Sequence, residues 1–290
     1  MLEMFRFPAP FEHVPIEFGP PSIDPKTLTW FFEMVQADER TIVFSNDLLT
    51  IAIHGTSRVE VDVVPGTHPD VVEAMLYGYV MRMLFLHSGV FNLHASLLRF
   101  DGGNHSRTVA IAGHSGAGKS TTVTALAGRP GAQLLVDDVL PMTVTNGVVI
   151  GHPFRRPVHL LPEAAERLRL DARIVGDGTV VDGLGKLVCD LASDSGAVTI
   201  DRVVILEQGP LDTSESVVVR EVRGAERLRL LVRHSNATGV ASHGSRADAY
   251  LDWVTSVASL LPMTSISRRP DTDTLEEVVS HVARLLGAET

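Results

Sequence analysis

The feature that most constrains this chain is an eight-residue run with the spacing Gly-x4-Gly-Lys-Ser, namely Gly113-His114-Ser115-Gly116-Ala117-Gly118-Lys119-Ser120. An apolar run, Thr108–Ala112, predicts a strand before it, and Lys119–Ala127 predicts a helix after it. The glycines let the backbone turn and approach a ligand closely, while the N–H groups at the start of the helix surround an anion. The order strand, loop, helix therefore predicts an α/β fold with a phosphate-binding site.

Three residues at the end of this run have expected roles. Lys119 would neutralise the β- and γ-phosphates of a nucleotide, and the Ser120 hydroxyl would bind magnesium. Thr121 is expected to be a helix residue or a nucleotide contact. ATP and Mg²⁺ are the expected cofactors, although the loop reads phosphates and leaves the choice between ATP and GTP open. A glycine-rich turn without a ligand is disfavoured, because the spacing and its strand–helix setting agree independently.

Two adjacent carboxylates, Asp137 and Asp138, follow the predicted buried strand Gln133–Val136. They come 18 and 19 residues after Lys119, the length of one helix, a turn and a strand, so the chain has returned to the same sheet edge. Because strands alternate faces, the two side chains should point differently. One would bind the metal and the other would act as a base toward an acceptor hydroxyl. The plainer alternative is a solvated strand end.

A histidine and three cations remain as weaker candidates. His94 lies in Leu93-His94-Ala95-Ser96, on a predicted strand that runs from Phe91 to Phe100. Alone, such a histidine is usually structural, although it is able to lend a proton or charge to a carboxylate. Arg155, Arg156 and Lys186 lie in the Gly- and Pro-rich segment Gly151–Ala197, which we expect to form loops over the site; surface solvation is their default interpretation.

Composition supports a globular chain and disfavours several classes of partner. Hydrophobic residues make up 44% of the 290 residues, enough for a full core in one or two domains. The formal net charge of −10 disfavours nucleic acid as a general partner. Cys189 is the single cysteine, so neither an intrachain disulfide nor a thiolate metal cluster is possible. We therefore expect a cytoplasmic protein.

Neither an export signal nor a membrane span is expected. The first 20 residues contain Glu3, Glu12 and Glu17 and no basic region that leads into an apolar stretch. The most apolar stretch, Ala74–Leu86, has 13 residues and includes Arg82, whereas a membrane-spanning helix requires about 20. We interpret it as part of a buried core helix, and we expect no membrane partner.

The remaining pattern predicts two parts: a small α+β N-terminal domain over residues 1–90 and a catalytic domain over residues 91–290. The first part contains three β-rich runs that predict a small antiparallel sheet, followed by a helix that Asp70 caps and that ends near Ser88. The runs are Thr41–Phe44, Leu49–His54 and Val59–Val64. The second part has further predicted strands at Val139–Val144, Val148–Ile150, Thr199–Leu206 and Ser216–Val219, and helices at Pro162–Leu168, Gly224–His234, Ala247–Leu261 and Thr274–Leu286.

The motifs together resemble the catalytic domain of the bacterial HPr serine kinase/phosphorylase family and its relatives, which include kinases of ribosomally made peptides. The resemblance is clear from about Leu93 to Val144, where the histidine strand, the phosphate loop and Leu135-Val136-Asp137-Asp138 follow the family's order and approximate spacing. It implies a fold of the α/β class: a P-loop nucleotide-binding core of the HPr kinase type with a mixed sheet.

The resemblance also implies roles for individual residues. Asp137 is expected to be the base, with His94 and Lys119 assisting catalysis, and Ser120 and Asp138 are expected at the metal; the order of the two aspartates stays open. The chain departs from the enzymes that act on HPr at His114, where they carry an acidic residue, and Val181–Lys186 echoes their glycine-containing signature only faintly. These departures disfavour HPr itself as the substrate.

The expected activity is an ATP- and Mg²⁺-dependent kinase that phosphorylates a Ser or Thr hydroxyl of a peptide or small protein. A ribosomal precursor peptide is one such acceptor. Two alternatives keep the same loop: a kinase of small-molecule hydroxyls, and a nucleotide-binding switch without phosphoryl transfer. The resemblance is also compatible with a homo-oligomer.

Overall fold

The computed structural model describes residues 5–102, 105–168, 187–189, 196–236, 238–270 and 273–286. Val181–Gly185 and Lys186 lie outside these residues. The described chain divides into two compact units. The first holds residues 5–92 and 238–252, and the second holds the remainder. Residues 238–252, which the sequence pattern grouped with the catalytic domain, thus cluster with the first unit.

The first unit contains a six-stranded sheet with the order β1-β6-β5-β4-β3-β2. The three β-rich runs of the sequence form its centre as antiparallel neighbours, which confirms the predicted small sheet. Three strands of only three residues each complete it, and these were too short to be recognised from alternation. The strands are β1 (Ile16–Phe18), β2 (Trp30–Phe32), β3 (Val35–Ala37), β4 (Thr41–Ser45), β5 (Leu49–His54) and β6 (Arg58–Val63).

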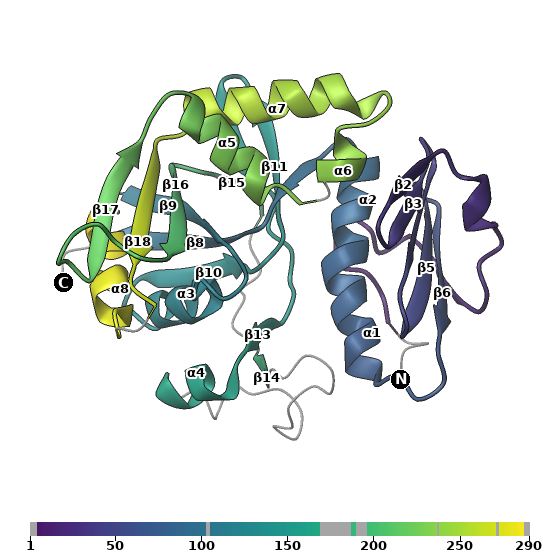
Figure 1. Ribbon diagram of the computed structural model, residues 1–290, viewed down its shortest axis with the longest axis horizontal. Helices are drawn as coiled ribbons and strands as arrows, with labels where there is room; N and C mark the ends of the chain where they lie inside the picture. The colour runs from purple at the N-terminus through teal and green to yellow at the C-terminus, as the bar shows by residue number, and fades with distance from the viewer. Residues whose placement is uncertain are drawn as a thin grey trace. The chain divides into compact units, whose positions relative to one another are not determined.

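A helical segment follows this sheet in the same unit and lies along one of its faces (Figure 1). It consists of α1 (Pro69–Met75), the π-helical turn η3 (Leu76–Val80) and α2 (Met81–His87). The predicted cap was wrong: His68 caps the helix, because its Nδ1 accepts a hydrogen bond of 3.3 Å from the Asp70 N–H. None of the described helices is long and apolar enough to cross a membrane.

The second unit is built on a mixed six-stranded sheet with the order β10-β8-β9-β16-β18-β17. The central strands β9, β16 and β18 run parallel; β8 and β17 pair antiparallel to β9 and β18, and the edge strand β10 pairs antiparallel to β8. The predicted mixed α/β architecture is thereby confirmed. The strands are β8 (Ala95–Gly102), β9 (His105–Gly113), β10 (Ala132–Val136), β16 (Arg202–Gln208), β17 (Val217–Val222) and β18 (Met263–Arg268). Strand β18 was not predicted from the sequence.

One predicted strand proves to be two. The run Phe91–Phe100 is interrupted at His94, whose N–H donates to the His234 carbonyl at 2.7 Å. The pieces before and after it, β7 (Phe91–Leu93) and β8, belong to different sheets. The sheet of β7 also contains the predicted hairpin β11 (Leu140–Thr145) and β12 (Val148–Gly151), together with β15 (Val198–Thr199). A two-stranded sheet joins β13 (Val158–Leu160) to β14 (Leu187–Cys189), and neither strand was predicted.

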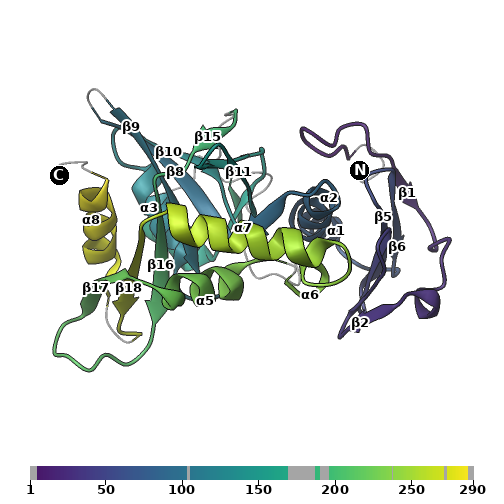
Figure 2. The same cartoon turned by 90° about the horizontal axis from the view of Figure 1, so that it is seen from above.

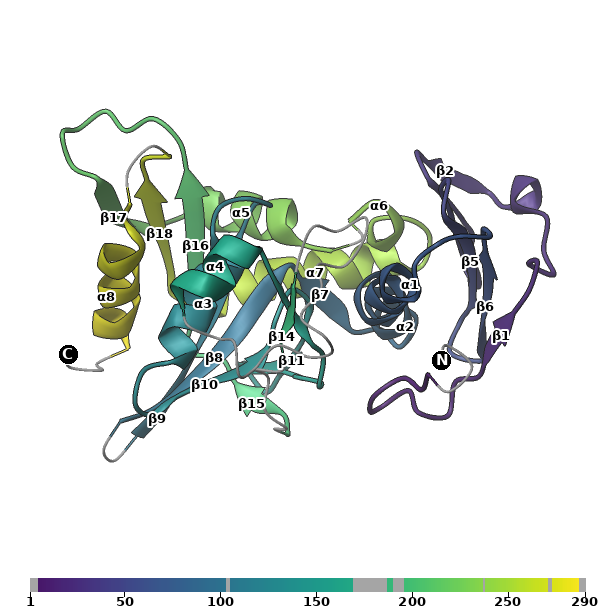
Figure 3. The same cartoon turned by 90° about the horizontal axis from the view of Figure 1, so that it is seen from below.

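Helices cover both faces of the mixed sheet. Helices α3 and α4 lie on one side and α5 on the other (Figures 1 and 3). Helix α3 also contacts α8, which lies against β17 (Figure 2). Apolar residues of α3, α8, β9 and β16, including Val123, Val279, Ile111 and Val204, form one buried cluster beside the loop after β9. The helices are α3 (Lys119–Ala127), α4 (Pro162–Arg167), α5 (Ala225–His234), α6 (Thr238–Ala241), α7 (Arg246–Leu260) and α8 (Leu275–Leu285).

Candidate functional site

The glycine-rich loop lies between β9 and α3, as its spacing predicts. At Gly113 a Cβ atom would stand 2.9 Å from the Leu206 carbonyl oxygen, so the close approach of β9 and β16 requires glycine there. Gly116 and Gly118 have left-handed backbone angles, with φ of 83° and 82°. The first helical hydrogen bond runs from the Thr122 N–H to the Gly118 carbonyl, so the N–H groups just before it are left for a ligand.

Lys119 begins helix α3 and is 7% exposed. Its Nζ lies 3.7 Å from Asp137 Oδ1 and 3.8 Å from Asp138 Oδ1. The loop lysine and both predicted carboxylates therefore meet in one cluster. A buried ammonium group at the start of the helix is positioned to meet an anionic ligand placed on the loop.

Asp137 is buried, with 3% of its surface exposed, and it faces the hydroxyl groups of two serines. Ser120 Oγ donates to its Oδ2 at 3.3 Å, and Ser96 Oγ from β8 donates to its Oδ1. A hydroxyl and a carboxylate, two oxygen ligands of the kind that a hydrated magnesium ion uses, thus lie side by side at Ser120 and Asp137.

Asp138 points elsewhere because the chain turns sharply between the two aspartates. The Val139 N–H donates to the Asp137 carbonyl at 2.8 Å, and Asp138 has a φ of 68°, which non-glycine residues adopt at a cost. This turn separates the two carboxylates. The Asp138 carboxylate accepts a hydrogen bond of 2.7 Å from His94 Nε2 and one of 3.0 Å from Arg156 Nη1.

The charge of Asp138 is strongly stabilised by these neighbours. Burial alone would raise its pKa, but the hydrogen bond from His94 and the positive charges of Arg156 and Lys119 hold the pKa well below its ordinary value. Asp138 is therefore ionised at neutral pH. Its side chain keeps 34% of its surface exposed, so it still faces the solvent side of the cluster.

The neighbours of the two aspartates do not match the roles expected from the resemblance. Asp137, expected as the base, lies against Ser120, whereas Asp138, expected at the metal, lies against His94. His94, Lys119, Ser120 and both aspartates are brought together within the second unit.

A pocket of about 440 Å³ is lined by residues of both the loop and this cluster. Its rim is open among the described residues, since His114, Ser115 and Gly116 are exposed and Leu161 is 53% exposed. The residues that line it are His94, His114, Ser115, Gly116, Gly118, Lys119, Ser120, Thr121, Asp138, His159, Leu160 and Leu161. Of the loop residues in the prediction, Gly113 and Ala117 are buried beneath it.

The buried His234 contacts the loop through His114. The ring of His114 lies against that of His234, with centroids 5.1 Å apart. His234 is 3% exposed, and its Nε2 has no hydrogen-bond partner in the described part of the chain. Burial, together with the charges of His114, Arg233, His94 and Lys119, lowers the pKa of His234 to about 4. The imidazole is therefore neutral at pH 7.

The residues present fit a nucleotide with magnesium. Among the described residues, no three or more His, Cys, Asp or Glu side chains gather as a ready-made metal site. Magnesium does not require one, because it commonly binds through one or two protein oxygens, water and the phosphates of the substrate. The Ser120 hydroxyl and the Asp137 carboxylate would supply such oxygens, and the loop N–H groups and Lys119 would face the phosphates of a bound nucleotide.

Three residues of this cluster had no specific role predicted from the sequence. Ser96 belongs to the histidine motif but had no predicted role, Arg156 was a weaker candidate with surface solvation as its default interpretation, and His234 was predicted only as the end of a helix. In the structure Arg156 is 5% exposed and bound to Asp138, while Arg155 is exposed. Burial of Arg156 follows from tertiary packing, so no local signal distinguished it. The candidate Lys186 lies outside the described residues.

Among known proteins, only solved structures match this chain. No family model matches the sequence, and no curated protein does. Among solved structures, the chain is similar to the Hpr(Ser) kinase/phosphatase from Coxiella burnetii, with 17% sequence identity and a TM-score of 0.33. The match covers 67% of this chain and 89% of that chain. It names the same family that the sequence motifs resemble.

Proposed function

We propose that the protein is an ATP- and Mg²⁺-dependent kinase that transfers the γ-phosphoryl group to a Ser or Thr hydroxyl of a peptide or small protein. The observation that carries the proposal is the ionised Asp138, held by His94 and Arg156 in the same pocket as Lys119 and the glycine-rich loop. A carboxylate beside a phosphate site suits an alcohol acceptor.

The surroundings of the aspartates support one division of roles. Asp137, next to Ser120, would hold the hydrated magnesium, whose charge neutralises the phosphate oxygens. Asp138 would accept the hydroxyl proton as the acceptor oxygen bonds to the γ-phosphorus and the bond to the bridging oxygen breaks, which leaves ADP. Its low pKa is compatible with this role, because phosphoryl transfer depends mainly on positioning and charge. His94 and Arg156 would position the carboxylate.

The open rim of the pocket supports a peptide over a small molecule. A small acceptor is usually enclosed, with most of its surface buried. Here His114 and Ser115 are exposed, and Leu161 presents an exposed apolar side chain beside the cluster. A hydroxyl at the end of a peptide side chain reaches Asp138 from this side while the peptide backbone stays outside the pocket.

The test uses γ-labelled ATP with the short peptides encoded beside the gene, and mass spectrometry locates the phosphate. Asp138→Asn is expected to slow transfer by about 100-fold or more with magnesium and ATP binding nearly unchanged. Asp137→Asn is expected to raise the magnesium concentration needed for half-maximal activity. The exposed Asp212→Asn serves as the control.

The outcomes distinguish the proposed kinase from the small-molecule kinase and from the switch. Unchanged transfer in both Asp137→Asn and Asp138→Asn rules out the proposed site. Phosphate that reaches only sugars or free amino acids supports the small-molecule kinase. Tight binding of ATP with magnesium, with no phosphate transferred to any acceptor or to water, supports the switch.

A further inference from the structure

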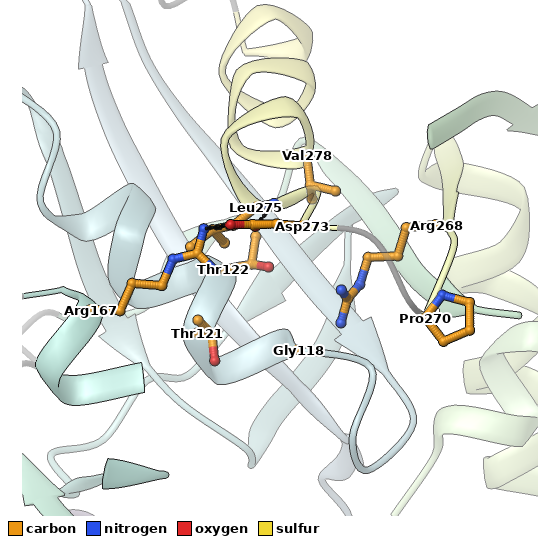
Figure 4. A pocket seen from close by; sticks show the side chains of 9 residues that line it. All are labelled: Gly118, Thr121, Thr122, Arg167, Arg268, Pro270, Asp273, Leu275 and Val278. Carbon is orange, nitrogen blue, oxygen red and sulfur yellow. Dashed lines mark hydrogen bonds and ion pairs between the residues drawn. The ribbon is translucent and has the colours of Figure 1, made fainter. Parts of the chain in front are cut away.

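A second pocket lies beside the start of helix α3 and belongs to the same unit as the first (Figure 4). Its volume is about 400 Å³, within the ordinary range for small-ligand sites of ~300–1,000 Å³. The residues that line it are Gly118, Thr121, Thr122, Arg167, Arg268, Pro270, Asp273, Leu275 and Val278. Apart from Gly118 and Thr121, the proposed phosphoryl transfer uses none of them.

The two pockets meet at the loop. Gly118 and Thr121 line both of them. The loop N–H groups and Lys119 face the first pocket, where the terminal phosphates would lie. A ligand that extends from these phosphates across Gly118 and Thr121 therefore enters the second pocket. Lys119, Asp137 and Asp138 do not line this pocket.

Arg268 forms one wall of this second pocket and is held against the loop. Its Nη2 and Nε donate to the Ala117 carbonyl at 3.1 and 3.3 Å. At Gly118 a Cβ atom would lie 2.7 Å from Arg268 Nη2, so the missing side chain leaves the space that the guanidinium occupies. Figure 4 shows this guanidinium pointing toward Gly118, with the Pro270 ring to its right, on the side away from Gly118. The guanidinium is a flat, pre-positioned cation of the kind that stacks on aromatic rings.

The other walls differ in character. Leu275 and Val278 of α8 provide an apolar surface, and Thr121 and Thr122 of α3 lie opposite them (Figure 4). The far end is polar, because Arg167 Nη2 donates to both carboxylate oxygens of Asp273 at 2.7 Å. A flat cation, an apolar wall and a polar end together suit a ligand with a flat heteroaromatic ring joined to a hydroxylated sugar.

We propose that this second pocket binds the nucleoside half of the nucleotide, with the sugar beside Gly118 and Thr121, where the ligand crosses from the phosphates, and the base against Arg268. The proposal rests on the proposed function for the location of the phosphates. It assigns base recognition to β18 and α8, two elements of the chain that the phosphate loop does not include.

The test compares two ligands that share the phosphates. The affinities of ATP and of inorganic tripolyphosphate, each with magnesium, are measured by calorimetry on the full chain and its variants. Arg268→Ala is expected to weaken ATP binding at least tenfold and to change tripolyphosphate binding less than twofold. Preserved tripolyphosphate binding also shows that the variant is folded. Arg129→Ala serves as the matched control, because it removes an ion pair to Glu276 of α8 without touching the pocket.

Three results would overturn the proposal. They are ATP affinity that Arg268→Ala leaves unchanged, an equal loss for both ligands, and wild-type protein that binds tripolyphosphate as tightly as ATP. The phosphate loop is tested separately with Lys119→Ala, which is expected to weaken both ligands. If Lys119→Ala weakens neither, the proposed function fails, whatever Arg268→Ala does.

Discussion

At the residue scale, adjacent carboxylates have acquired different surroundings through one backbone turn. Asp138 adopts a left-handed conformation with φ of 68°, and this directs its carboxylate to His94 and Arg156, while that of Asp137 stays with Ser96 and Ser120. Asparagine tolerates the same conformation, so Asp138→Asn removes the charge without added backbone strain. This is why the substitution isolates the chemistry of Asp138.

The buried His234 makes stability depend on pH. Its pKa is about 4 in the folded chain, against an ordinary value of 6.5 for histidine, so between these values the unfolded chain binds more protons. The contribution of His234 to stability is therefore complete above pH 6.5 and is lost as the pH falls toward 4, with a total of about 3 kcal/mol at most.

We expect the urea midpoint of wild-type protein to fall between pH 7 and pH 4.5, and His234→Gln to reduce that fall. His13→Gln, at an exposed histidine, is the control and is expected to leave the fall unchanged. An identical pH dependence in wild type and His234→Gln would contradict the argument.

At the scale of elements, the loop between β9 and α3 requires glycine for two separable reasons. Gly116 and Gly118 have nearly the same φ, but a Cβ at Gly116 would meet nothing within 4 Å, whereas one at Gly118 would meet Arg268. Backbone strain thus acts at both positions and steric conflict only at Gly118. The difference in stability between alanine variants at these two positions therefore measures how firmly Arg268 of β18 is held against the loop.

Gly116→Ala is expected to destabilise the protein by about 1–2 kcal/mol through its left-handed conformation alone. Gly118→Ala is expected to cost more, because Arg268 must also move. Thermal unfolding of the two variants checks the order, and the combination of Gly118→Ala with Arg268→Ala is expected to recover part of the difference. Equal unfolding midpoints for Gly116→Ala and Gly118→Ala would show that the Arg268 side chain moves aside without a measurable loss of stability.

At the scale of the whole molecule, each unit has a core of its own. Ile42, Ile51 and Ile53 are fully buried in the sheet of the first unit, and Val109, Val204 and Val282 are fully buried in the second. The proposed nucleotide site belongs entirely to the second unit. A ligand that binds only the folded second unit stabilises that unit by mass action.

Magnesium ATP is therefore expected to slow amide hydrogen exchange in β9, α3 and β10, with little change in β4, β5 and β6. Exchange measured by mass spectrometry at 100 times the dissociation constant should show protection of about 2.7 kcal/mol in the second unit. Lys119→Ala is expected to abolish the protection. Equal protection of β4–β6 would mean that the two units respond as one.

The sequence by itself determined the local features of this protein. The spacing of the loop and the helical pattern after it located the loop and α3, and alternation located β4, β5 and β6, because these signals come from neighbouring residues. The presence of two aspartates at the end of β10 was also readable, since it depends only on the length of one helix, a turn and a strand.

The tertiary structure alone decided how these features combine. Strand β18 joins the sheet by pairing with β16 and β17, and the run through His94 divides because its N–H bonds to His234, distant in sequence. The surroundings of Asp137 and Asp138, the burial of Arg156 and the place of Arg268 at the loop follow from these long-range contacts. No local pattern encodes them, because each depends on which distant segment the folded backbone brings near.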